Sequence, residues 1–594
     1  MADDENEHVI DERFEWNACG NTCTPISSYL DVLKLKCFRP AWQNNILKLS
    51  NVSVNCFSGK DLHCHEICID LPKHRKKRSN VPKTLFCHDL KGGYLEDRFV
   101  HGSKKHDEYR FFHWAGIDTF IYFSHQLVTI PPPVWINSAH LHGTKVLGTL
   151  ITEWDDGKKI WEEILKSDST VEDFVDSLVT ICYNFGFDGY LINVENVIPM
   201  EHIGKLELFV SLLHSKLHSK IPHAEVLWYD SVTNEGKLKW QNELNDRNRI
   251  FFDNCDGIFL NYTWSEEDLK NSAEIAGSRH LDVYVGVDVF GRNCYGGGHF
   301  NTYQAVEVAR KHNLSLALFA PSWVHEYFGG SYFVHLEYVF WQKLWPYLYI
   351  RGPTQLPFRT TFCQGYGEKM YHNGLVTCNS SWYNLSKQQY QPTVPSCLND
   401  SFVDPVVKSR TEEGSISFEK QDILKLISVG CIQHYPQDAF TGGGCLQVCQ
   451  LSKDRHSQRI FTCSFESRGE VLISFASKPN SEDNTSINVV LLTEDSNGVC
   501  RSWVLMGQFS NKSKSDMGKT GVHHVFPKTE KEIADLKETV KGMAHDQLSL
   551  TAGSGWKLRH YLLELHETIV DISVELCGPG TAVLLGLFSI IPLE

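Results

Sequence analysis

The sequence predicts an α/β protein in which a (β/α)₈ TIM barrel is followed by all-β sandwich domains, one or two in number. Between residues 84 and 321, a short apolar segment followed by a polar or helical stretch recurs eight times. After residue 353, Pro and Gly punctuate the chain, and short alternating runs replace the long helical periods. We therefore expect an N-terminal extension over residues 1–79 that packs on or leads into the barrel, the barrel over 80–352, and the β-sandwich region over 353–594.

Eight segments have the composition of barrel strands. They are rich in Val, Ile, Leu and Phe at both odd and even positions, as expected of strands that are buried on both faces. The expected strands are Thr84–Asp89, Thr119–Ser124, Lys145–Thr152, Gly189–Glu195, Glu225–Asp230, Gly257–Tyr262, Val283–Asp288 and Leu314–Ala320.

Helical signals lie between the strands. In "STVEDFVDSLVTICYNFG", apolar residues recur at helical spacing, Thr170 with Asp173 resembles a capping box, and Gly186 stands where a helix would end. An open, doubly wound sheet is the competing fold. It would be expected to carry a Gly-rich phosphate loop after its first strand, and "HDLKGGYLEDRF" lacks the G-x-G-x-x-G pattern. The barrel is therefore the preferred prediction.

The region after residue 353 reads as all-β. Runs such as "RIFTCSF", "EVLISFAS", "INVVLLT" and "AVLLGLFSII" are short and apolar, as sandwich strands are. The polar stretch from Ser510 to Glu538 is expected to be an insertion or a mobile loop.

Charge and composition narrow the class of protein. The net charge of −15 argues against a general nucleic-acid binder, and neither a secretory signal nor a membrane-spanning apolar stretch is recognisable. The 19 cysteines are scattered, which favours reduced thiols in a reducing compartment. The basic run over 73–78 is expected to be a solvated loop. The cluster over 63–68, HCHEIC, has no second ligand pair at zinc-site spacing, so no metal or cofactor is expected.

The stretch "GFDGYLINVEN" carries the strongest chemical signal. It is an apolar strand that ends in Asn193 and Glu195, two residues apart and therefore on one face. An apolar surrounding should raise the pKa of Glu195 and suit it to general-acid catalysis of glycoside cleavage. The neighbour on the same face is an amide rather than the usual second carboxylate. This pairing fits a substrate that supplies its own nucleophile, the oxygen of a 2-acetamido group, which Asn193 would orient.

Polar and aromatic residues also gather where the other strands end, which is the active-site face of a barrel. Aromatic faces beside polar groups suit sugar rings. The expected substrate-binding residues from this reasoning are His88, Trp154, Trp228, Asn261, Tyr262, Trp264, Asp288, Phe290 and Trp323.

These motifs resemble, in order, those of the endo-β-N-acetylglucosaminidases of glycoside hydrolase family 85. The matching segments are "CHDLKGGYLEDRF", "GTLITEW", "GFDGYLINVEN", "LWYDSV", "LKWQNELN", "DGIFLNYTW" and "VGVDVFGRN". The resemblance covers roughly residues 80 to 350.

The resemblance implies roles for individual residues. Glu195 would act as general acid and then base, Asn193 would hold the acetamido group with support from Tyr229, and Trp240 would join Trp264 and Phe290 as a wall residue. The bond cut would lie inside the chitobiose core of N-glycans, on free oligosaccharides and glycoproteins. Animal-type members resemble this chain in lacking a signal peptide, which implies the cytosol. The β domains resemble carbohydrate-binding sandwiches.

Two other functions remain open. A chitinase-like barrel would use a D-G-x-D-x-D-x-E strand, but Leu191 and Asn193 stand where two of its Asp would be. A catalytically inactive glycan-binding lectin is the other alternative, and the presence of both Asn193 and Glu195 argues against it. Glycan preference, the balance of hydrolysis and transfer, and the oligomeric state are not readable from the sequence.

Overall fold

Eight parallel strands close into a barrel, as the sequence predicts. The strand order is β4-β3-β11-β10-β9-β8-β7-β6, and pairing of β4 with β6 closes the ring. The short strand β5 (Val128–Thr129) adds antiparallel to β6. The barrel strands are β3 (Thr84–His88), β4 (Thr119–Tyr122), β6 (Lys145–Glu153), β7 (Gly189–Glu195), β8 (Glu225–Tyr229), β9 (Gly257–Phe259), β10 (Val283–Asp288) and β11 (Ser315–Phe319).

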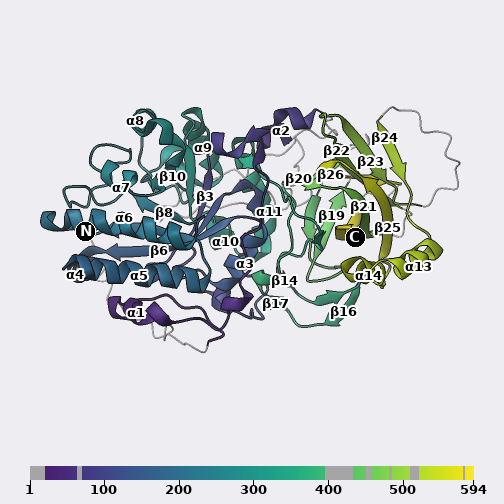
Figure 1. Ribbon diagram of the computed structural model, residues 1–594, viewed down its shortest axis with the longest axis horizontal. Helices are drawn as coiled ribbons and strands as arrows, with labels where there is room; N and C mark the ends of the chain where they lie inside the picture. The colour runs from purple at the N-terminus through teal and green to yellow at the C-terminus, as the bar shows by residue number, and fades with distance from the viewer. Residues whose placement is uncertain are drawn as a thin grey trace.

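The computed structural model describes most of the chain. The described residues are 20–62, 70–394, 432–449, 457–479, 485–508, 521–578 and 582–593. The HCHEIC cluster over 63–68 lies outside them. In Figure 1 the barrel, coloured purple to teal, lies beside a β-rich half, coloured green to yellow.

Alternation along each strand separates two apolar layers. Leu85, Leu147 and Leu191 belong to a cluster that fills the barrel interior. Residues at the alternate positions, such as Phe86 and Ile192, face outward and join the larger cluster between the strands and the helices. A strand residue in this barrel therefore faces either the interior or the helices, and its parity decides which.

Helices cover the outside of the barrel (Figure 1). They are α3 (Pro133–Leu141), α4 (Trp154–Ile164), α5 (Asp168–Phe185), α6 (Ile203–Lys220), α7 (Arg249–Asp253), α8 (Glu266–Ala276), α9 (Thr302–Lys311), α10 (Trp323–Phe328) and α11 (Gly330–Leu344). Between β3 and β4 the chain forms only short 3₁₀ turns, at Glu96–Arg98 and Trp114–Gly116. The barrel thus departs from strict strand–helix alternation at its first unit.

Helix α5 begins earlier than its sequence signal suggested. Its capping box joins Ser167 and Thr170, whose side chains each accept the other's backbone N–H, at 3.1 and 2.9 Å. The expected pairing of Thr170 with Asp173 is therefore wrong, because Thr170 is already inside the first turn. Gly186 ends the helix at a φ of 79°, as expected.

The β-rich half is a sandwich of two facing sheets. One sheet has the order β18-β19-β27-β21-β25, with β13 paired to β27, and the other has the order β20-β26-β22-β23-β24. Side chains from both sheets, such as Ile473 and Val489, share one apolar core. The strands are β13 (Phe358–Thr360), β18 (Ile432–Tyr435), β19 (Cys445–Cys449), β20 (Gln458–Glu466), β21 (Gly469–Pro479), β22 (Ser486–Glu494), β23 (Cys500–Leu505), β24 (Val522–Val525), β25 (Lys557–Leu565), β26 (Thr568–Cys577) and β27 (Ala582–Pro592).

Part of the stretch 510–538 has regular structure, which corrects the expectation of a loop. Its residues from 521 onward form β24 and most of α13 (Glu530–Thr539), which α14 (Gly542–Leu548) follows. The strand pairs in parallel with β23. Residues 510–520 lie outside the described residues.

Short elements join the two halves. The N-terminal segment contributes α1 (Tyr29–Lys34), α2 (Gly59–Leu62) and β1 (Asn55–Ser58), which pairs with β2 (Lys76–Lys77) and β12 (Tyr349–Ile350). Two further hairpin-like pairs follow the barrel. They are β14 (Tyr366–Gly367) with β17 (Trp382–Tyr383), and β15 (Met370–His372) with β16 (Leu375–Cys378).

The basic run over 73–78 is not simply a solvated loop. Arg75 forms an ion pair with Glu494 of the sandwich, and Arg78 donates through Nε to Asp118 at 2.8 Å. Arg78 and its neighbour Arg351 hold the pKa of the buried Asp118 carboxyl well below its usual range, against the opposing effect of burial. The run therefore contributes to the contact between the halves.

Two further features bear on the class of protein. No helix among the described residues has the length and apolar character needed to cross a bilayer. Cysteines in the barrel such as Cys87 and Cys182 are buried free thiols, in agreement with the expectation of reduced cysteines.

Candidate active site

Strand β7 places Asn193 and Glu195 on its interior face. Leu191, at the same parity, lies in the interior core, so the next two side chains of that face emerge at the carboxyl end of the strand. Asn193 is 4% exposed, and Glu195 is half-buried. At the start of the strand, Gly189 allows β8 to approach closely, since a Cβ there would lie 1.9 Å from the carbonyl oxygen of Glu225.

The environment of Glu195 favours its protonated form. Burial raises the pKa of Glu195, and the charge of Glu153 raises it further. His125 and the hydrogen bonds from Asn193 and Trp240 oppose this shift. A carboxylic acid with a raised pKa can deliver a proton near neutral pH, as a general acid requires.

Glu153 and His125 are the charged or titratable neighbours that act on Glu195 at the carboxyl end of the barrel strands, the rim of the barrel. Glu153 is the register partner of Glu195 on the neighbouring strand β6. His125 Nδ1 lies 3.1 and 3.2 Å from the two Glu153 carboxylate oxygens, and this contact raises the pKa of His125. Both follow or end apolar strands in the sequence, but neither was among the expected catalytic or substrate-binding residues, although the alternation of "TLITE" puts Glu153 on the interior face.

Asn193 offers an acceptor that nothing in the described residues uses. Its side chain hydrogen-bonds Glu195, while its buried Oδ1 has no hydrogen-bond partner there. An unpartnered buried carbonyl oxygen is costly unless a ligand satisfies it. Asn193 can therefore accept a hydrogen bond from an N–H group placed beside the acid.

A hydrogen-bonded chain runs from Tyr229 across the rim. The Tyr229 hydroxyl donates to Asn261 Oδ1 at 2.9 Å, and Asn261 Nδ2 donates to Asn242 Oδ1 at 2.7 Å. Burial and the nearby Glu195 charge raise the pKa of Tyr229 well above its ordinary value. Tyr229 thus stays protonated and acts only as a neutral hydrogen-bonding group.

Asp230 anchors the loop that carries Trp240. Its carboxylate accepts the backbone N–H of Gln241 at 3.0 Å and of Asn242 at 2.7 Å, and Asn248 Nδ2 at 3.0 Å. Burial raises the pKa of Asp230 to about 6, against these hydrogen bonds. Trp240 itself is 37% exposed and reaches Glu195. Asp230 was missed as a functional residue because its loop partners are eleven or more residues away.

Several other expected substrate-binding residues also lie at the rim. Trp154 is 62% exposed and has a positive φ of 50°. Tyr262 packs against the interior core, and Phe290 is half-buried beneath the Arg292 guanidinium. Asp288 faces the interior, where Arg292 donates to it through Nε at 2.8 Å. Asp288 therefore holds its loop through an ion pair.

Four expected substrate-binding residues lie elsewhere. His88 and Trp228 have outward parity and are buried in the helix layer, where Trp228 stacks on Phe251 at a centroid distance of 4.1 Å. His88 packs among aromatic rings, and burial lowers its pKa to about 3. The structure contradicts a substrate-binding role for both.

Trp264 and Trp323 also present no open ring face. Trp264 is buried, donates its indole N–H to the carbonyl oxygen of Gly286 at 2.7 Å, and is covered by the stacked ring of Tyr295. Trp323 is 1% exposed, between residues such as Phe300 and Tyr327. Both support the rim from below, contrary to the expectation of direct sugar stacking.

Comparison with known proteins identifies the family of the barrel. Residues 94–370 match the profile of glycosyl hydrolase family 85. The chain is 38% identical to a cytosolic endo-beta-N-acetylglucosaminidase of Danio rerio over 81% of this chain and 62% of that protein. It is 44% identical to the protein of the same name from Homo sapiens, over 63% of this chain and 48% of that one.

These relatives are longer than the matched regions. The chain covers less than two thirds of the length of each, from 46% for the relative in Gallus gallus to 62% for that in Danio rerio. Among solved structures, the glycoside hydrolase domain of Endo-D from Streptococcus pneumoniae R6 has the same fold. Its TM-score is 0.66 at 17% identity, over 96% of this chain and 83% of that one.

The ordered motifs, the closed barrel with Asn193 and Glu195 at its rim, and these matches agree: the barrel of this chain belongs to glycosyl hydrolase family 85.

Proposed function

We propose that the chain is an endo-β-N-acetylglucosaminidase that hydrolyses the GlcNAc-β1,4-GlcNAc bond of the N-glycan chitobiose core. It acts on free oligosaccharides and on glycoproteins or glycopeptides, and leaves one GlcNAc on the protein. The observation that carries the proposal is the pair on β7, an acid with a raised pKa and an amide with an unpartnered buried oxygen on the same face.

The proposed first step uses the substrate as nucleophile. Glu195 donates its proton to the glycosidic oxygen as the bond to C1 breaks. The acetamido carbonyl oxygen of the same sugar attacks C1 and closes an oxazolinium ring. Asn193 Oδ1 accepts the acetamido N–H, which aims the group and stabilises the positive charge that develops on it.

The second step restores the acid. The Glu195 carboxylate accepts a proton from water, and the water oxygen adds to C1 from the face that the leaving sugar vacated. The ring opens, the acetamido group is regenerated, and the anomeric configuration is retained. Glu153 supports both steps because its charge raises the pKa of Glu195, which helps the acid to hold its proton before the first step and makes the carboxylate a stronger base in the second.

The exposed aromatic rings are the proposed walls for the glycan. Trp240 and Trp154 have exposed rings, and Phe290 is half-buried. Such rings stack on the C–H side of sugar rings, while polar groups such as Asn261 bond the hydroxyls.

The geometry is less compatible with the other two functions. A chitinase-like site needs a carboxylate where Leu191 stands, but that side chain lies in the apolar interior core. A lectin has no use for a carboxyl group with a raised pKa beside an unpartnered amide oxygen. We propose the cytosol as the compartment, which is the one in the names of the relatives.

Digestion of a high-mannose glycopeptide, followed by mass spectrometry, tests the proposal. We expect a GlcNAc-bearing peptide from the wild-type chain and no cleavage by Glu195→Gln. Turnover of chitin oligosaccharides alone would support the chitinase-like alternative, and binding without turnover would support the lectin. Either result would overturn the proposal.

A further inference from the structure

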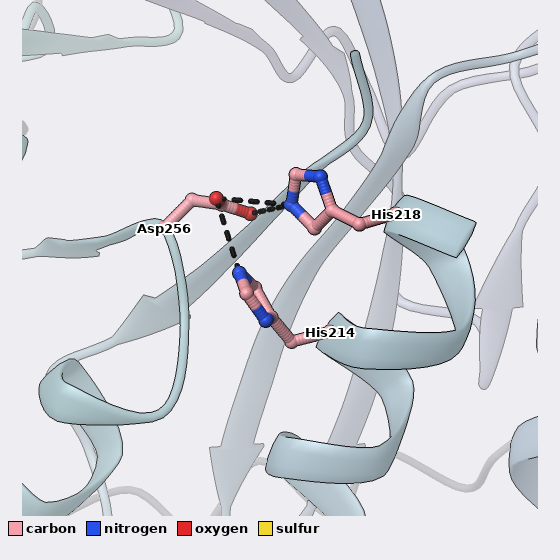
Figure 2. Close-up of side chains that lie close together, drawn as sticks. All are labelled: His214, His218 and Asp256. Carbon is pink, nitrogen blue, oxygen red and sulfur yellow. Dashed lines mark hydrogen bonds and ion pairs between the residues drawn. The ribbon is translucent and has the colours of Figure 1, made fainter. Parts of the chain in front are cut away.

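We propose that His214, His218 and Asp256 bind one Zn²⁺ ion at the end of the barrel opposite the active site. The two histidines lie one turn apart near the C-terminal end of α6, and Asp256 directly precedes β9. Figure 2 shows both imidazoles directed at the Asp256 carboxylate. No metal was expected from the sequence, in which Asp256 and His218 are 38 residues apart.

The donor atoms are spaced as zinc ligands are. Asp256 Oδ1 lies 3.2 Å from His214 Nε2 and 3.0 Å from His218 Nε2. One atom from each of the three residues fits within 4.8 Å of the other two. Zinc bonds of about 2.0–2.1 Å in a tetrahedron place neighbouring ligand atoms about 3.3 Å apart. Shifts of a few tenths of an ångström would therefore complete the site.

The outer contact of His218 is one that histidine ligands of metals commonly make. His218 Nδ1 lies 3.4 Å from the carbonyl oxygen of Pro222, which can only accept a hydrogen bond. When Nδ1 carries the proton, Nε2 of the neutral ring points a lone pair at the Asp256 oxygens. Histidine ligands of metals are commonly fixed by this outer hydrogen bond. In that tautomer a metal ion can take the lone pair of Nε2.

The donor atoms of the three residues converge on one point. His214 Nε2 contacts Asp256 Oδ1, His218 Nε2 lies 3.0 Å from both carboxylate oxygens, and the two ring centroids lie 4.5 Å apart. One divalent ion satisfies all three donors at once.

A second cluster, formed by Asp188, His140 and His223, shows how two histidines can contact one carboxylate through ordinary hydrogen bonds. Asp188 also contacts two histidines, but His140 bonds its Oδ2 at 2.8 Å and His223 bonds its Oδ1 at 2.9 Å. Each ring has its own oxygen, so ordinary hydrogen bonds account for the arrangement. His223 therefore provides a matched control for the convergent site.

The proposed site is accessible and has a structural use. The side chains of His214, His218 and Asp256 are 35%, 30% and 25% exposed, so water can reach the ion and fill its fourth position. Asp256 Oδ2 accepts the backbone N–H of Val226 on β8 at 2.8 Å. A bound ion would thus tie α6 to the starts of β8 and β9, and would stabilise the barrel without touching its chemistry.

The test uses the full chain without an affinity tag, stripped with a chelator. Titration calorimetry with Zn²⁺, and visible absorption with Co²⁺, should detect a site in the wild type and in His223→Gln. His218→Gln should weaken that binding by more than about tenfold, since even outer-shell changes cost about 10–100-fold. Zn²⁺ should raise the Tm of the wild type and of His223→Gln, but not that of His218→Gln.

The same experiment can overturn the proposal. Unchanged binding in both His218→Gln and His214→Gln, or no binding by the wild type, would show that this cluster is not a zinc site. Binding that is lost in Cys64→Ser but kept in His218→Gln would place the ion elsewhere. X-ray absorption on the zinc-loaded wild type should show imidazole nitrogen and oxygen ligands, and sulfur ligation would contradict the assignment.

Discussion

Glu337 on α11 provides a quantitative test of how the helix layer is built. Its side chain is fully buried, Oε1 accepts the Trp341 indole N–H at 2.9 Å, and Oε2 has no hydrogen-bond partner among the described residues. Burial raises the pKa of Glu337 from 4.5 to about 8, while Trp341 and Arg110 oppose the shift. The folded protein therefore holds this residue as a neutral acid at pH 7.

The direction of the pH effect follows from this raised pKa. Below a pH of about 4.5 the group is protonated in both folded and unfolded chains, so its contribution to stability is fully present. Between that pH and about 8, the unfolded chain releases the proton and the folded chain retains it. The free energy of unfolding then falls by about 1.4 kcal/mol per pH unit, or about 3 kcal/mol between pH 5 and pH 7.

Replacing Glu337 with Gln should remove this loss, because the amide is neutral and keeps an acceptor for Trp341. At about 2 °C per kcal/mol, the Tm of Glu337→Gln should fall about 6 °C less than that of the wild type between pH 5 and pH 7. Glu163→Gln, on the exposed face of α4, should follow the wild type. Equal pH dependence of Glu337→Gln and the wild type, in calorimetric melts, would refute a neutral buried acid.

Three further predictions concern the active site. Glu153→Gln should move the alkaline limb of the pH profile of kcat/KM to lower pH, because the Glu153 charge raises the pKa of Glu195. An alkaline limb that stays at the wild-type pH in glycopeptide assays would contradict this influence of Glu153. Trp240→Ala should raise KM by about tenfold through lost stacking of roughly 1.4 kcal/mol, whereas Trp228→Phe should leave KM unchanged. Equal effects of the two substitutions on KM in initial-rate assays would contradict the assignment of Trp240 to the substrate side and of Trp228 to the helix layer. Tyr229→Phe should lower kcat with little change in Tm, since it removes one hydroxyl while the ring stays packed. A lower Tm with unchanged kcat would show that Tyr229 has a purely structural role.

The barrel was predictable because eight doubly buried strands leave a compositional signal that survives without tertiary information. The orientation of the catalytic pair was predictable for a similar reason. Alternation from the buried Leu191 fixes the face of Asn193 and Glu195. The same reasoning, applied from Leu85 to His88 and from Leu227 to Trp228, would have placed both residues outward.

Other features depend on contacts that no local pattern encodes. Trp264 and Trp323 follow the ends of their strands, where alternation no longer applies, and neighbouring loops decide whether their rings are covered. Asp230 owes its role to backbone N–H groups of a loop that returns to the strand end. The pairing of His214 with Asp256 depends on how α6 packs beside β9, which only the fold provides.

The division of labour between Asn193 and Glu195 is tested most directly with a preformed glycan oxazoline as donor and a GlcNAc acceptor. In hydrolysis of a glycopeptide, Glu195→Gln and Asn193→Ala should each lose activity, by about 10²–10⁴-fold for the acid. The oxazoline has already passed the step that Asn193 assists. Asn193→Ala should therefore still transfer the sugar with Glu195 as base, whereas Glu195→Gln should transfer it poorly. Equal use of the oxazoline by both variants would contradict these roles and would show that Glu195 is not the general base.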